Sequence, residues 1–271
     1  MKDEVALPGA AELERLAVDL AEGAAALVRD TGTGGIRIAA KSTATDLVTE
    51  VDRAVERWLV ERIRALRPDD GILGEEGGGR PGTSGVRWVV DPIDGTVNFV
   101  LGLPQFAVSV AAEVEGRPVA GAVANPLTGE TFRARIGGGA HLGAERLTGP
   151  RQVALSRAVI GTGFGYDATV RARQVAAVVP LLPAVGDLRR LGAASLDLCF
   201  VAAGRLDAYF EAGLNLWDHA AGGLIATEAG CVTSGLRGRP PSAQCYAVAG
   251  PGLAAEFFAL LESVDADRVG G

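Results

Sequence analysis

The stretch WVVDPIDGTVNF, residues 88–99, decides how we interpret this chain. Its hydrophobic start predicts a buried strand, which ends at Asp91, and Asp94 follows three positions later, beyond Pro92. Two like charges at one strand end repel each other unless a cation lies between them. Carboxylates are ligands of hard cations such as Mg²⁺ or Mn²⁺. The stretch therefore predicts a metal site, with an ordinary polar turn as the alternative interpretation.

The end of the same stretch adds a second prediction. Gly95 and Thr96 open the next segment, and a helix beginning there would present free N–H groups, which bind anions. Carboxylates beside such an amide cradle indicate metal-assisted phosphate chemistry.

Composition limits the class of protein and its partners. Of the 271 residues, 48% are hydrophobic and 22% are charged, as in a folded globular protein. The formal net charge of −7 argues against a nucleic-acid partner. No apolar run reaches the ~20 residues that span a bilayer, the N-terminus does not resemble a secretory signal, and the three cysteines lack metal-ligand spacing. We therefore expect a cytoplasmic protein with no membrane partner.

The first half of the chain combines helices with a run of strands. Apolar residues at helical spacing predict one helix over 10–30 and another from an N-cap at Asp46 to about Arg67, before Pro68. Short strands are expected at 71–76 and 86–91. The stretch 106–142 is typical of antiparallel strands joined by tight turns.

Strands alternate with helices in the second half. We expect strands at 158–164, 206–211 and 245–250, and helices over 168–182, from about 195, over 217–230 and over 252–263. Such alternation favours a more parallel α/β arrangement. We therefore predict an N-terminal half, 1–152, and a C-terminal half, 153–271.

Further acidic positions strengthen the metal prediction, although each has an ordinary explanation. Glu75 and Glu76 follow a short apolar strand and could be a solvated strand end. Asp218 begins an apolar helix, where it could simply complement the helix dipole. Asp52 lies at the edge of a buried helical stripe and would need a partner there.

Motifs in a fixed order resemble the inositol monophosphatase family, the Mg²⁺-dependent, lithium-sensitive phosphatases. They are DLVTEVD (46–52), GEE (74–76), WVVDPIDGTVNF (88–99), RRLGAASLDL (189–198) and WDHAAGGLIATEAG (217–230). The resemblance spans essentially the whole chain and is strongest to the bacterial inositol-1-phosphatase branch.

The resemblance implies a role for each matching position. The metal ligands would be Glu75, Asp91, the carbonyl of Ile93, Asp94 and Asp218. A hydrogen-bonded pair of Thr96 and Asp52, with Glu75 nearby, would position or activate the attacking water. The substrate contacts would be Asp94, Gly95, Thr96, Arg189, Gly192, Ala193, Ala194, Glu211 and Asp218. Lys41 would lie in a mobile loop that closes near the metals.

The resemblance also implies a reaction, a fold and partners. Two or three Mg²⁺ ions, with Mn²⁺ as a substitute, would clamp the attacking water and the ester oxygen of myo-inositol 1-phosphate. Lithium would inhibit the reaction. The fold would be a layered α/β/α/β/α sandwich with an antiparallel N-terminal sheet and a mostly parallel C-terminal sheet. The family further implies a homodimer.

Departures from the family pattern keep two alternatives open. Position 193, where some relatives carry serine or threonine, is Ala193, and the residues at the rim include Asn215 and His219. The substrate could therefore be another small phosphate ester: histidinol phosphate, fructose 1,6-bisphosphate or 3′-phosphoadenosine 5′-phosphate. A third hypothesis is a metal-bound fold that serves mainly as a platform for protein interactions.

Overall fold

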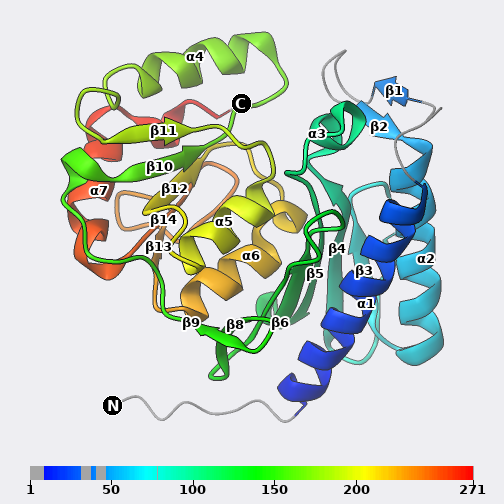
Figure 1. Cartoon of the computed structure of the whole chain (residues 1–271). Coiled ribbons are helices and arrows are strands. Elements are labelled where there is room, and N and C mark those ends of the chain that lie inside the picture. The colour runs from blue at the N-terminus through cyan, green and yellow to red at the C-terminus, as the bar shows by residue number, and fades with distance from the viewer. Residues whose placement is uncertain (1–8, 32–37, 41–46, 78, 271) are drawn as a thin grey trace.

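The computed structural model describes residues 9–31, 38–40, 47–77 and 79–270. Its two large sheets separate three layers of helices (Figure 1). The predicted α/β sandwich is therefore confirmed. In the described part of the chain, no helix has both the length and the apolar character needed to cross a membrane.

The larger sheet has seven strands in chain order. They are β3 (Gly71–Gly74), β4 (Val86–Asp94), β5 (Ala107–Val114), β6 (Arg117–Ala124), β7 (Thr131–Arg135), β8 (Gly139–Leu142) and β9 (Glu145–Leu147). All neighbours are antiparallel except β3 and β4, which run parallel. The turn between β5 and β6 has positive φ at both Glu115 (52°) and Gly116 (73°), which matches the twist of a tight hairpin.

Two helices cover the outer face of this sheet (Figure 1). α1 (Ala10–Thr31) agrees with its prediction, but α2 (Glu50–Leu66) begins later than expected. Leu47–Thr49 forms strand β2, paired with β1 (Ile38–Ala40), and Thr49 is the N-cap. Its hydroxyl accepts the N–H groups of Val51 and Asp52, each at 3.2 Å. The expected cap Asp46 lies outside the described residues, as does Lys41.

The smaller sheet has five strands in the order β11 (Asp187–Arg189), β10 (Val159–Thr162), β12 (Ala208–Glu211), β14 (Tyr246–Ala249) and β13 (Val232–Ser234). The pairings of β10 with β11 and β12 are parallel, whereas β14 pairs antiparallel with β12 and with β13. The expected parallel arrangement thus holds for one side of a mixed sheet. No helix lies between β13 and β14, where every residue is described, so the chain can turn back and pair the two strands antiparallel.

The middle layer consists of α5 (Ala194–Ala202) and α6 (Leu216–Glu228), which lie between the two sheets (Figure 1). α5 is buried along its whole length and α6 over 220–226, and the residues of both are mostly apolar there, as buried helices require. The outer layer on the far side contains α7 (Pro251–Ser263) and α4 (Ala168–Val178). α4 ends short of the expected residue 182: Val179 still has helical backbone angles, but Pro180 has no N–H with which to continue the helical hydrogen bonds.

Candidate active site

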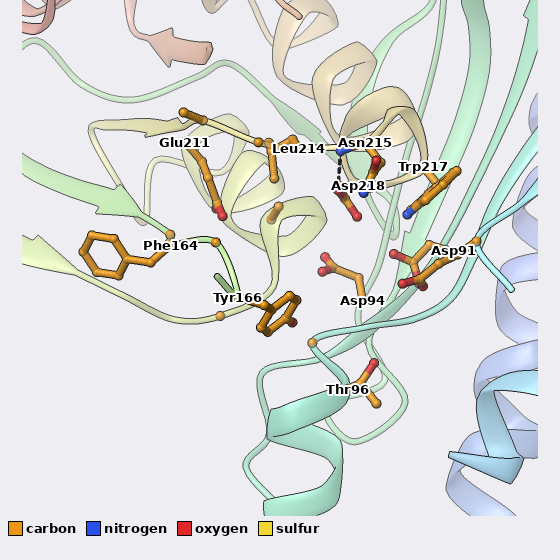
Figure 2. Close-up of a pocket in the computed structure, with 18 of the residues that line it drawn as sticks. Asp91, Asp94, Thr96, Phe164, Tyr166, Glu211, Leu214, Asn215, Trp217 and Asp218 are labelled. Carbon is orange, nitrogen blue, oxygen red and sulfur yellow. Dashed lines mark hydrogen bonds between the residues drawn. The ribbon is translucent and has the colours of Figure 1, made fainter. Parts of the chain in front are cut away.

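A cavity of about 300 Å³ lies where strand ends of both sheets meet the start of α6 (Figure 2). Most of the expected site residues line it. They are Glu75, Asp91, Ile93, Asp94, Gly95, Thr96, Gly192, Ala194, Glu211 and Asp218. Residues more than 100 positions apart thus share one space, which brings the two halves of the chain into one candidate site.

Asp91 and Asp94 both reach the cavity because strand β4 is irregular at its end. In a regular strand, residues three apart point to opposite faces. The pairing of β4 with β5 shifts register between Asp91 and Asp94, as a β-bulge does, and so re-aims a side chain. The N–H of Ile93 donates to Asp91 Oδ1 at 3.0 Å and fixes this turn.

The remaining carboxylates come from other elements. Asp218 lies in the first turn of α6, and its Oδ2 accepts the N–H of Asn215 at 2.6 Å. Glu75 follows β3, and the N–H of the next residue, Glu76, donates to Glu56 Oε2 of α2 at 2.7 Å. Figure 2 shows the carboxyl groups of Asp91, Asp94 and Asp218 facing a common space.

The electrostatics of this space disfavour charge on the acids. Burial, followed by the charges of Glu75, Asp94 and Asp218, raises the pKa of Asp91 well above its ordinary value. Burial raises the pKa of Asp94 to about 6, although hydrogen bonds from Ser195 act to lower it. Burial and the charge of Asp94 likewise raise the pKa of Asp218. The protein alone therefore disfavours the ionised form of these carboxyl groups.

This donor set fits a hard divalent cation. Clustered carboxylate oxygens with raised pKa values are stabilised as anions when a cation binds between them. As the side chains stand, the described residues contain no group of three or more His, Cys, Asp or Glu that could already hold a metal ion.

Gly95 connects the carboxylates to α3 (Thr96–Leu101) through a backbone that only glycine accommodates. Its φ is +90°, and a Cβ there would lie 2.9 Å from the carbonyl oxygen of Gln105 and 3.1 Å from that of Gly192. The backbone of residues 95–96 therefore passes close to the substrate segment expected at 192–194.

The expected partners Asp52 and Thr96 lie side by side behind the cavity. Thr96 Oγ1 is 3.2 Å from Asp52 Oδ1 and 3.1 Å from the carbonyl oxygen of Ile93. Asp52 is fully buried, and burial raises its pKa to about 6 despite hydrogen bonds from Thr49. Thr96 lines the cavity and Asp52 does not, so Asp52 reaches the site through Thr96.

Glu211 forms part of the opposite wall, at the end of β12. The hydroxyl of Tyr209 donates to its Oε2 at 2.5 Å, and burial raises the pKa of Glu211 to about 7. A side chain at Gly163, on the neighbouring strand end, would overlap this carboxyl group. The absence of a side chain at Gly163 therefore leaves room for the carboxyl group of Glu211.

Three expected contacts are not part of the cavity lining in the described structure. Arg189 is exposed, and its Nη1 lies 2.6 Å from Asp187 Oδ2, on the surface. Ala193 is buried against Gly95, so that its side chain does not face the cavity. Lys41 lies outside the described residues.

The cavity also has lining residues that the sequence analysis missed. They are Gly163, Phe164, Gly165, Tyr166, Arg190, Ala212, Gly213, Leu214 and Trp217, whereas Asn215, expected at the rim, also lines the cavity. The arginine that lines the cavity is Arg190, not the expected Arg189. The two arginines are adjacent in the sequence, and residue type alone does not distinguish them. Phe164 and Tyr166 follow β10, and a strand end bearing aromatic residues between glycines was the available signal.

Comparisons with known proteins agree with this geometry. A family model described as the inositol monophosphatase family matches residues 10–265. The chain is 48% identical to an inositol-1-monophosphatase of Mycobacterium leprae, over 93% of this chain and 94% of the relative. It is also 45% identical to a protein of Pasteurella multocida named Nus factor SuhB, over 73% of this chain and 74% of that protein.

Solved structures resemble the fold over nearly its whole length. Mycobacterium tuberculosis SuhB superimposes with a TM-score of 0.80 at 42% identity, covering 95% of this chain and 98% of that chain. SaIMPase-II with inositol monophosphate bound gives a TM-score of 0.76 at 29% identity, covering 96% of this chain and 95% of that chain.

Proposed function

The chain belongs to the inositol monophosphatase family and is an inositol-phosphate phosphatase, and from this premise we propose that it is a Mg²⁺-dependent enzyme that hydrolyses myo-inositol 1-phosphate. The family is generally metal-dependent. The identity of the ion, the choice of substrate and the role of each site residue are parts of this proposal.

The observation that carries the proposal is the shared cavity of Asp91, Asp94 and Asp218. All three carboxyl groups have raised pKa values, and no ion pair between described residues ends on any of them. Such an arrangement is costly for a protein unless a cation offsets it. In an inositol-phosphate phosphatase, a cation there would also meet the phosphate.

We assign the metal-holding role to Glu75, Asp91, the carbonyl of Ile93, Asp94 and Asp218. Bound Mg²⁺ would supply Lewis acidity, lowering the pKa of a water molecule and offsetting charge on the leaving oxygen. Mn²⁺ has the same preference for oxygen ligands and is a possible substitute. Asp218, in the first turn of α6, would lie near the leaving oxygen.

The chain's own groups would orient the reactants. The N–H groups of Gly95 and Thr96 would hold phosphate oxygens, since free amides at the start of a helix favour an anion. The Thr96 hydroxyl, which donates to Asp52 at 3.2 Å, would accept a hydrogen bond from the attacking water, and a proton lost by the water would be balanced by transfer of the hydroxyl proton to the Asp52 carboxylate, with Glu75 nearby. Glu211 and the backbone of 192–194 would hydrogen-bond the ring hydroxyls.

A direct test is phosphate release from inositol 1-phosphate with and without Mg²⁺, and with added lithium. The expected result is turnover that requires Mg²⁺, is inhibited by lithium and is abolished in Asp94→Asn. Parallel assays with histidinol phosphate, fructose 1,6-bisphosphate and 3′-phosphoadenosine 5′-phosphate compare the alternatives. Absence of metal-dependent release from all four esters would overturn the proposal.

We also propose a cytoplasmic homodimer. The three cysteines, Cys199, Cys231 and Cys245, are all buried and unpaired, which suits a reducing compartment. Val175, Val179 and Leu182 are about half exposed along and just beyond α4, and a second copy of the chain would cover them. Light scattering of the purified protein and of Val179→Asp tests this, with a dimer expected for the first and a monomer for the second.

A second candidate function is interaction with other proteins. The relative named Nus factor SuhB is the observation that favours it. Asp94→Asn separates the two functions, because it removes a catalytic carboxylate without changing the surface. If the chain served only as an interaction platform, wild type and variant would have the same negligible turnover.

A further inference from the structure

Ser195 makes two hydrogen bonds to the same oxygen of a cavity carboxylate. Its hydroxyl donates to Asp94 Oδ2 at 2.5 Å, and its backbone N–H donates to that same oxygen at 2.7 Å. Both residues are buried, and Ser195 has no measurable exposure. Asp94 comes from the seven-stranded sheet and Ser195 from α5, 101 positions later in the chain.

Asp94 therefore serves as the N-terminal cap of α5. The N-cap residue itself, Ala193, makes no side-chain hydrogen bond to the helix. A carboxylate that accepts an N–H of the first turn satisfies an otherwise unpaired donor and complements the helix dipole. The start of α5 thus depends on a residue that also faces the cavity.

The two bonds from Ser195 restrain the orientation of the Asp94 carboxylate. Both bonds from Ser195 end on Oδ2, and the backbone of Ala194 gives this carboxylate a further hydrogen bond. A hydroxyl and an amide on one oxygen also fix the plane of the carboxylate, because their two directions leave little freedom of rotation.

The α5 helix cannot shift easily to release this contact. A Cβ at Gly222 of α6 would lie 2.8 Å from the carbonyl oxygen of Ser195, so the two helices are packed backbone to backbone there. Gly222 lies one turn after Asp218, the cavity aspartate that the C-terminal half supplies. The position of Ser195 is therefore set by the same helix pair that positions Asp218.

We propose that Ser195 is a positioning residue that holds Asp94 by its Oδ2 and so orients this carboxylate toward a divalent cation in the cavity. This inference rests on the proposed function, in which Asp94 is a metal ligand. Hydrogen bonds that orient a ligating carboxylate commonly change metal affinity by about 10–100-fold when removed. The hydroxyl of Ser195 supplies such a bond, and its N–H supplies a second that no side-chain substitution removes.

The test is calorimetric titration of Mg²⁺ into the full-length wild type, Ser195→Ala and Ser195→Cys, without substrate. Ser195→Ala keeps the backbone bond and loses the hydroxyl, so we expect its Mg²⁺ dissociation constant to rise about tenfold. Ser195→Cys keeps the size of the side chain with a weaker donor, so an intermediate value is expected. If the alanine variant folds poorly, the cysteine variant still tests the proposal.

Controls separate positioning from a general structural effect. Thr227→Val removes another hydroxyl bond in the middle layer, to the carbonyl of Gly223, away from the cavity. Its Mg²⁺ affinity should equal that of wild type. Unfolding temperatures in chelator show whether each variant is folded when its affinity is measured.

The outcomes distinguish this inference from the proposed function. Unchanged Mg²⁺ affinity in both Ser195 variants, with wild-type affinity intact, would overturn the positioning role alone. A wild-type protein that binds no Mg²⁺ would overturn the proposed metal site and this inference with it. Weaker binding that follows the order wild type, cysteine, alanine supports both.

Discussion

Buried aspartates have opposite environments in two regions of this molecule. Asp70, behind the seven-stranded sheet, accepts hydrogen bonds from Arg67 at 2.9 Å, Ser84 at 2.6 Å and Trp88 at 2.9 Å. Burial acts to raise its pKa, but these donors outweigh burial and hold the pKa below its ordinary value. Asp91 is equally buried, yet burial and the neighbouring acids raise its pKa.

The difference shows which aspartates serve the fold and which serve the site. A protein selected only for stability pairs its buried acids, as it does for Asp70 and for Asp267 with Arg237 and Arg239. Asp91, Asp94 and Asp218 form no such ion pair with any described residue, which costs stability in the metal-free protein. Buried acids with raised pKa values that share one cavity are typical of a functional site.

The largest expected effect comes from Asp91→Asn. Removing a proposed metal ligand should lower turnover by more than about a hundredfold. Loss of a residue that only hydrogen-bonds to a ligand typically costs about 10–100-fold. The same variant should unfold at a higher temperature than wild type in chelator, because one unfavourable buried charge is gone. A phosphate-release assay and thermal unfolding measure the two effects. Lower thermal stability in chelator would contradict the comparison.

Asp70→Asn should have the opposite effect on stability. The amide keeps the shape but loses the charge-assisted bonds to Arg67, so we expect about 1–3 kcal/mol less free energy of unfolding. Denaturant unfolding measures this loss, and turnover of the folded variant should stay close to that of wild type. A loss below about 0.5 kcal/mol would show that the cluster contributes little.

The two adjacent arginines offer a matched test of the cavity wall. Arg190 lines the cavity, whereas Arg189 pairs with Asp187 outside it. Arg190→Ala should raise KM for inositol 1-phosphate about tenfold, the equivalent of one hydrogen bond to a charged donor. Arg189→Ala should change KM less than twofold. In steady-state kinetics, a larger increase of KM for Arg189→Ala than for Arg190→Ala would contradict this assignment of the cavity wall.

The smallest expected effect is a change of stability with pH in chelator. The folded pKa of Asp94, about 6, lies above its ordinary value of 3.8, so the folded protein binds more protons between those values. Its stability should therefore fall as pH rises from about 4 to about 6. Asp70, with a lowered pKa, contributes fully above about pH 4 and loses its contribution only at lower pH.

Thermal unfolding at several pH values, with chelator and with saturating Mg²⁺, measures this effect. The stabilisation by Mg²⁺ should grow as pH rises, because the metal binds the deprotonated carboxylates. The Asp94→Asn variant should show a weaker pH dependence in chelator. Equal pH dependence in that variant would assign the effect to other groups.

Local pattern predicted most of the elements. The helical spacing of apolar residues in 10–30 and the turn at Glu115 and Gly116 depend on neighbours in the sequence, so both could be expected before the structure. The start of α2 was wrong, because Leu47–Thr49 pairs with β1, a partner supplied by another segment. The mixed direction of the five-stranded sheet depends likewise on contacts between distant segments.

For the candidate site, the sequence determined the chemical types and the structure determined the arrangement. Acids at strand and helix ends, within motifs of known order, were enough to expect Asp91, Asp94, Glu75 and Asp218 near a metal and a phosphate. Only the tertiary structure decided that Arg190 rather than Arg189 faces the cavity, and that Ser195 bonds to Asp94 across 101 positions. The physical reason is that residue type and spacing fix local chemistry, whereas the direction of each side chain depends on how the two sheets pack around α5 and α6.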